Sequence, residues 1–172
     1  MKTTIILALA ATLAGGPTLV PAIAATPETL PGKETETLVA ALASEPSLTT
    51  FTRLMKVTGL AESLRQGGPY TILAPDDGAF RMVPKDDMEQ LLDPGNREAL
   101  IQTLSYHILP ESIPLASVST EEYVTLQGSR LILNREGNTV WAGRAEVMKR
   151  DINGGNGNVI HTLNMVLEPD HQ

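Results

Sequence analysis

The sequence predicts an α+β domain, with helices in most of the first half and short strands in most of the second. Apolar residues recur at helical spacing between Leu38 and Leu64. After Tyr106, short apolar runs alternate with turn residues such as Gly128 and Gly143. Helices and strands that are segregated along the chain favour an α+β architecture over alternating βαβ units.

The N-terminus has the features of a secretory signal. Lys2 precedes the apolar run 5–14, and Ala22 and Ala24 form a small-residue cleavage pattern. The run is too short for a convincing membrane span, so an uncleaved anchor is the weaker interpretation. We therefore expect a secreted or periplasmic protein with four segments: a signal peptide at 1–24, a flexible lead-in at 25–35, one globular domain at 36–169 and a tail at 170–172.

Five helices are predicted. The apolar spacing indicates one helix from about Glu36 to Pro46 and continues from Leu48 to Leu64, where the glycines and proline at 67–69 end it. Two further helices are expected at 84–92 and 94–105, the second with proline in its first turn. Asp76 or Asp77 is expected to cap a helix that follows a short strand.

Short strands are predicted wherever an apolar run is bounded by turn residues. A strand at 70–74 precedes the predicted capping aspartates, and the remaining strands follow the last helix. They are expected at 106–109, 123–126, 130–134, 139–142, 145–149 and 159–167.

Composition excludes several classes of function. The chain has 20 acidic and 13 basic residues, a net charge of −7 and no cysteine. Negative charge repels phosphates, so nucleic acids and anionic lipid surfaces are poor partners. Thiol catalysis and cysteine-held metals are excluded. The scattered histidines do not form a zinc pattern, and no nucleophile motif is present, so we expect no cofactor, no metal and no enzymatic activity.

Three segments in order resemble the fasciclin (FAS1) domain family. The segment 71–80 is similar to the first family signature, Tyr106-His107 to its central Tyr-His motif, and 158–167 to its second signature. The chain departs from the usual pattern at Asp76 and at 162–164. The resemblance implies the FAS1 fold, a wedge-shaped domain with a sandwich-like β core packed against a helical layer.

The resemblance also implies a non-enzymatic binding module that mediates cell-surface adhesion or contact with a matrix or polysaccharide. The expected partner is a cell-surface protein or polysaccharide, and the expected state is a monomer. In animal relatives the Tyr-His region and an Asp-Ile dipeptide have been proposed as adhesion contacts. They correspond here to Tyr106, His107, Asp151 and Ile152. A few relatives bind carotenoids, so the alternative is a carrier of an apolar ligand such as a carotenoid or a lipid.

The residues themselves also support structural interpretations. His107 follows an apolar helix face, and His161 shares a strand face with Val159 and Leu163. Buried imidazoles are normally paired with backbone groups, so both histidines are predicted to hold the fold together. Asp151 equally fits a turn aspartate that holds its own loop.

Overall fold

A computed structural model describes residues 33–64, 67–116 and 118–169. The predicted signal peptide and the tail at 170–172 lie outside the described residues. The predicted lead-in lies outside them too, except that the first helix already begins at Lys33. Within the described ranges, no helix combines the length and the apolar composition needed to cross a bilayer.

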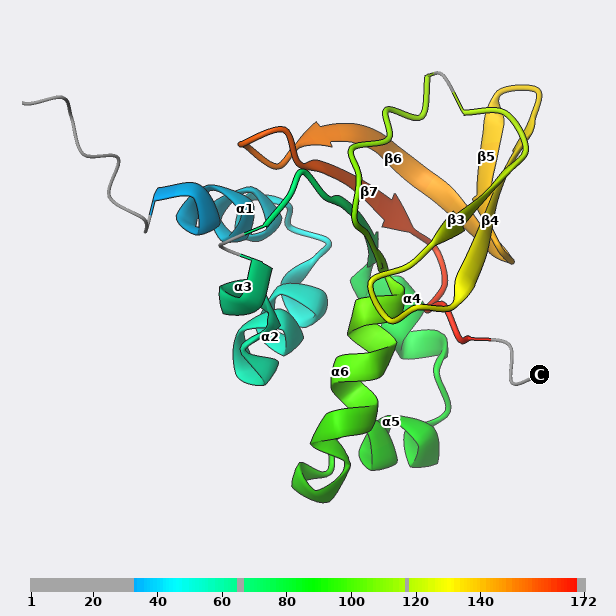
Figure 1. Cartoon of the computed structure of the whole chain (residues 1–172). Helices are drawn as coiled ribbons and strands as arrows, with labels where there is room; N and C mark the ends of the chain where they lie inside the picture. Colours follow the sequence, from blue (N-terminus) through cyan, green and yellow to red (C-terminus); the bar gives the residue numbers. More distant parts are fainter. Residues whose placement is uncertain (1–32, 65–66, 117, 170–172) are drawn as a thin grey trace, which may run out of the picture.

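The helical layer contains short helices that follow the predicted order (Figure 1). The predicted helix from Leu48 to Leu64 is divided in two at Gly59, where φ is +75°, a left-handed conformation that favours glycine. The elements are α1 (Lys33–Ser44), α2 (Thr49–Thr58), α3 (Leu60–Ser63), α4 (Asp77–Met82), α5 (Lys85–Leu92), the 3₁₀ turn η2 (Pro94–Asn96) and α6 (Arg97–Tyr106).

The strands form one seven-stranded sheet in the order β2-β1-β7-β6-β5-β4-β3. The β1–β7 pair is parallel, whereas all other neighbours are antiparallel. The backbone N–H of Leu126 donates to the carbonyl of Ile108 at 2.7 Å, which brings the chain after β3 against β2 and nearly closes the sheet. The bounds are β1 Thr71–Pro75, β2 Ile108–Leu109, β3 Glu121–Val124, β4 Arg130–Glu136, β5 Thr139–Ala142, β6 Ala145–Asn153 and β7 Val159–Leu163.

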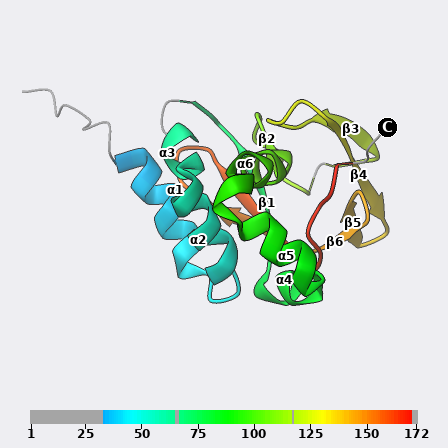
Figure 2. The same cartoon turned by 90° about the horizontal axis from the view of Figure 1, so that it is seen from below.

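Two apolar cores lie on opposite faces of the central strands. Ile72 and Ile160 belong to the core under the helices, whereas Leu73 and Leu163 belong to the core inside the curled sheet. This alternation follows from the two-residue period of a strand, which turns successive side chains to opposite faces. Figure 2 shows the helices gathered on one side of β1, with β3–β6 on the other.

Adjacent aspartates cap two different helices. The Asp76 carboxylate accepts the Ala79 N–H at 2.6 Å and caps its own helix, α4. The Asp77 carboxylate instead accepts the Thr50 N–H at 2.8 Å and the Thr49 hydroxyl at 2.5 Å, at the start of α2. The predicted capping of the helix that follows is therefore confirmed, and Asp77 additionally caps α2, which lies earlier in the sequence.

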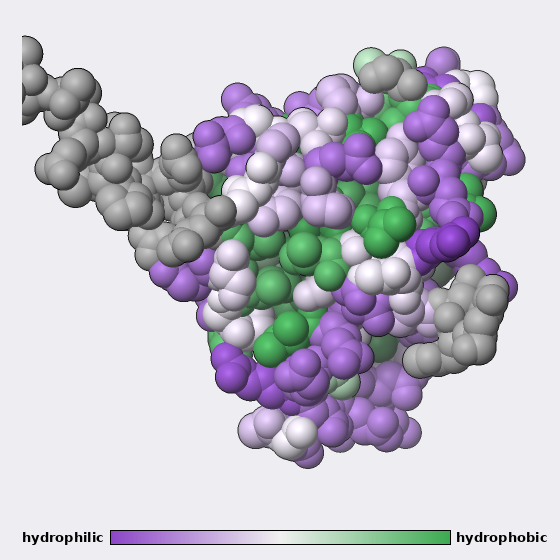
Figure 3. Space-filling model, viewed as in Figure 1, coloured by the Kyte–Doolittle hydropathy of each residue, from purple (hydrophilic) through white to green (hydrophobic). Residues whose placement is uncertain are grey.

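The surface in Figure 3 is mixed: hydrophilic residues cover the lower end of this face, whereas hydrophobic residues show in its middle.

Candidate functional site

His107 ties the end of α6 to the C-terminal segment. It is 1% exposed, and it follows the last residue of the helix. Its Nε2 accepts the Leu167 N–H at 2.9 Å, which leaves Nδ1 to donate to the Thr103 carbonyl at 2.7 Å. One neutral tautomer satisfies both contacts, so the imidazole joins two segments that are far apart in sequence.

His161 makes a matching arrangement on β7. Its Nδ1 accepts the Asp151 N–H at 3.0 Å, so Nε2 is the protonated nitrogen and donates to the Ile113 carbonyl at 3.1 Å. The ring is fully buried and lies between β6 and the loop after β2. Both histidines therefore bond to backbone groups through both ring nitrogens. The sequence predicted their structural role but not the second contact of each ring.

Burial lowers the pKa of both imidazoles. For His107 it brings the pKa to about 4, against a smaller upward effect of the Thr103 carbonyl. For His161 burial also lowers the pKa, although the Ile113 carbonyl and the Asp151 charge act in the opposite direction. Each ring is neutral at pH 7 and has no nitrogen left to exchange a proton with a substrate, so the arrangement stabilises structure rather than performing acid–base chemistry.

Tyr106 lies beside His107 in the core inside the sheet. Its side chain is 4% exposed, and its hydroxyl donates to the Arg130 carbonyl at 3.2 Å. His107 is therefore closed to a partner, and Tyr106 is accessible only where it lines a cavity beside α4. Of the four candidate adhesion residues, Asp151 and Ile152 are the ones that reach the surface.

Asp151 is exposed and is held in an unusual backbone conformation. Its φ is +55°, which a non-glycine residue adopts only with support. Its N–H bonds to His161, and its Oδ1 accepts the Leu115 N–H at 2.9 Å. The sequence singled out Asp151 and His161 separately but gave no sign that the buried imidazole positions the exposed aspartate.

Ile152 is half-buried beside it. It pairs with Ile160 across β6 and β7 and packs against the core under the helices. The four candidates therefore do not converge on one surface.

The turn after β6 is ordered by asparagine side chains that the sequence analysis did not single out. Asn153 Oδ1 accepts the Gly155 N–H at 2.8 Å, and Asn158 Oδ1 accepts the Tyr70 N–H at 2.9 Å. The second contact ties the turn to the segment before β1. The glycine-rich stretch is thus a turn that side-chain hydrogen bonds hold in place.

A cavity of about 430 Å³ lies between the end of α4, the C-terminal segment and the turn from β5 to β6. Met82, Leu131 and Met165 line it, together with the charged residues Arg144 and Glu168. Its size is within the range of small-molecule sites. Among the described residues, no group of three histidine or acidic side chains is arranged to hold a metal ion.

A family model described as "Fasciclin domain" matches residues 46–169. Protein sll1483 of Synechocystis sp. is 33% identical over 133 residues, which cover 77% of this chain and 73% of that protein. The transforming growth factor-beta-induced protein ig-h3 of Sus scrofa is 34% identical over 112 residues, which cover 64% of this chain but only 16% of that protein.

The fold also matches a solved structure of a FAS1 domain pair from the insect cell adhesion molecule fasciclin I. The TM-score is 0.55 and the sequence identity 20%, over 73% of this chain and 46% of that one. This likeness shows the fold. The ig-h3 protein and the insect structure both extend well beyond the region that matches this chain.

Proposed function

Because the chain belongs to the fasciclin domain family, we propose that it is a non-enzymatic adhesion module that acts outside the cytoplasm. Its partner is a cell-surface protein or polysaccharide. The predicted export signal supports the location, and membership of the fasciclin domain family supports the activity. Both buried imidazoles use their ring nitrogens in hydrogen bonds to the backbone, which supports a structural role rather than a catalytic one.

Asp151 carries the contact in this proposal. The positive φ of Asp151 costs backbone energy. Two hydrogen bonds hold the residue in this conformation: the Leu115 N–H donates to its carboxylate, and its own N–H donates to His161. Leu115 occupies Oδ1, so Oδ2 is the oxygen offered to a partner. Ile152 supplies a neighbouring apolar edge.

Labelled protein, applied to intact cells with their native surface coat, tests the proposal. We expect saturable binding that Asp151→Asn reduces at least fivefold, because removal of one charged contact typically costs about 1 kcal/mol or more. Asparagine keeps an oxygen for the Leu115 N–H and tolerates positive φ, so the loop is preserved. Pretreatment of the cells with protease or with periodate distinguishes a protein partner from a polysaccharide.

Asp86→Asn is the matched control, since Asp86 is an exposed aspartate on α5. Equal binding by wild type and Asp151→Asn would contradict the proposed contact, and absence of saturable binding would contradict adhesion itself.

The 430 Å³ cavity favours a second candidate function, that of a carrier for an apolar ligand. Methionine side chains adapt to varied apolar shapes, and Met82 and Met165 both line it. Stoichiometric lipid or pigment in a solvent extract of the native protein would favour the carrier over adhesion.

A further inference from the structure

A second hollow, of about 440 Å³, lies on the outer face of α2, on a different element from the cavity described above. We call it the α2 hollow. It is lined by Ala43 of α1, by Glu45 of the α1–α2 connection and by the α2 residues Thr49, Thr52, Arg53, Lys56 and Val57. The α2 members follow helical spacing, so they form one face of the helix, and Phe51 and Leu54 on the opposite face are buried in the core.

The charge of the α2 hollow is opposite to that of the protein. Arg53 and Lys56 are exposed, and within the described residues neither side chain has a hydrogen-bond or ion-pair partner. The chain as a whole carries a net charge of −7. Two uncompensated cations one helical turn apart on an acidic protein make a local site for an anion.

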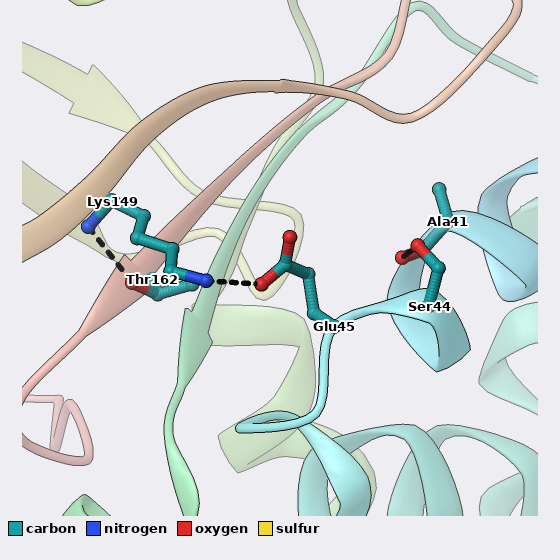
Figure 4. A network of polar contacts seen from close by, with 5 residues as sticks. All are labelled: Ala41, Ser44, Glu45, Lys149 and Thr162. Atoms are coloured by element: carbon teal, nitrogen blue, oxygen red, sulfur yellow. Dashed lines mark hydrogen bonds and ion pairs between the residues drawn. The ribbon is translucent and has the colours of Figure 1, made fainter.

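Glu45 would cancel this positive charge if its carboxylate were free. Figure 4 shows it turned toward Lys149 of β6, whose Nζ lies 2.6 Å from Glu45 Oε2. The Lys149 N–H also bonds to the Thr162 hydroxyl at 2.9 Å, which fixes the backbone at this point of β6. Lys149 therefore neutralises the one acidic side chain that lines the α2 hollow.

The rest of the lining combines the Thr49 and Thr52 side chains with apolar surface. Val57 is 66% exposed at the end of α2, and Ala43 contributes a methyl group from α1. From these features we propose that the α2 hollow binds an amphipathic carboxylate, with its anionic head at Arg53 and Lys56 and its aliphatic tail along Ala43 and Val57. The volume fits a small molecule rather than a whole helix of a partner.

Calorimetric titration with dodecanoate, below its micelle concentration, tests the proposal. We expect binding that the double variant Arg53→Gln/Lys56→Gln weakens about tenfold, because two partly exposed charge contacts together contribute about 1.4 kcal/mol. Dodecan-1-ol, which has the same tail without the charge, should bind at least tenfold more weakly than dodecanoate. Lys149→Met should also weaken dodecanoate, because it leaves the Glu45 charge uncompensated.

Lys85→Gln is the matched control: it removes an exposed cation from α5 and should change affinity less than twofold. Amide NMR shifts induced by dodecanoate should map to α2 and to the α1–α2 connection. The proposal is wrong if the double variant binds dodecanoate like wild type, if dodecan-1-ol binds equally well, or if the shifts map to Met82 and Met165. It is also wrong if an acidic, leucine-containing peptide binds at α2 and dodecanoate does not.

Discussion

At the scale of single residues, the two histidines show how a fold uses a titratable group without exposing it. Each ring accepts one backbone N–H and donates to one carbonyl, and each bridges segments distant in sequence. Because the accepting nitrogen must stay unprotonated, a proton added to either ring breaks a bond that holds the fold together. Acid is therefore expected to act first at these two positions.

His107 should make the protein lose stability as pH falls from about 6.5 to about 4. The unfolded chain binds a proton at His107 below pH 6.5, whereas the folded state binds one only below about 4. Stability is thus complete above pH 6.5, and about 3 kcal/mol is lost across that window. His161 acts in the same direction. Urea unfolding at pH 7, 5.5 and 4.5 measures the loss.

Imidazole NMR titration provides the residue-specific check. A short histidine peptide in the same sample, with the model-peptide pKa near 6.5, serves as the internal reference. A His107 resonance that titrates together with that of the peptide would show that the buried tautomer is not the dominant form.

At the scale of elements, α2 depends on a residue from another helix. Its N-cap residue is Leu48, whose side chain cannot accept a hydrogen bond. Asp77 supplies the missing acceptor from the start of α4. Burial by itself would raise the pKa of Asp77, but the hydrogen bonds from Thr49 and Thr50 outweigh burial and lower it. The carboxylate is therefore ionised at pH 7, and its negative charge interacts favourably with the positive end of the α2 dipole.

Asp77→Ala should destabilise the domain by about 1–2 kcal/mol, since the Thr50 N–H and the Thr49 hydroxyl both lose their acceptor. Chemical denaturation at pH 7 measures the change. Asp86→Ala removes an exposed carboxylate from α5 and should stay within about 0.5 kcal/mol of wild type. Similar values for the two variants would mean that α2 needs no cap from α4.

The elements that the sequence predicted well are those whose boundaries depend on local chemistry. The strand at 139–142 was predicted with its observed bounds, because turn residues flank it on both sides. The predicted strand at 145–149 continues to Asn153, because β6 keeps pairing with β7 through irregular registers that no local pattern reveals. Tyr106 was predicted to begin a strand but ends α6, since packing of the helix overrides a short apolar run.

The candidate site was only partly predictable for the same reason. Burial of His107 and His161 followed from their apolar neighbours. The bond between His161 and Asp151 did not, because it depends on the pairing of β6 with β7. Nor did the α2 hollow, since its charge depends on Lys149 reaching Glu45 from across the fold.

At the scale of the whole molecule, one parallel strand pair separates the two cores. β1 and β7 send alternate side chains into the helical layer and into the curled sheet, so neither core can form without them. Their parallel pairing joins residues 71–75 to residues 159–163, which are 88 positions further along the chain. Contacts of such long range make helices and sheet interdependent.

This arrangement predicts a single cooperative unfolding transition. Far-UV circular dichroism reports mainly on the helices, whereas fluorescence of Trp141, the one tryptophan of the sequence, reports on β5 in the sheet.

Ile160→Ala removes a side chain from the core under the helices alone and should lower the free energy of unfolding by about 2–4 kcal/mol. We expect it to shift both signals to the same lower urea concentration, because the loss of one core exposes the strands that support the other. Val124→Ala, at an exposed position of β3, should change the free energy of unfolding obtained from either signal by no more than about 0.5 kcal/mol. If the helical signal of Ile160→Ala moves while Trp141 fluorescence keeps its wild-type midpoint, the two cores fold independently and the shared strand pair does not couple them.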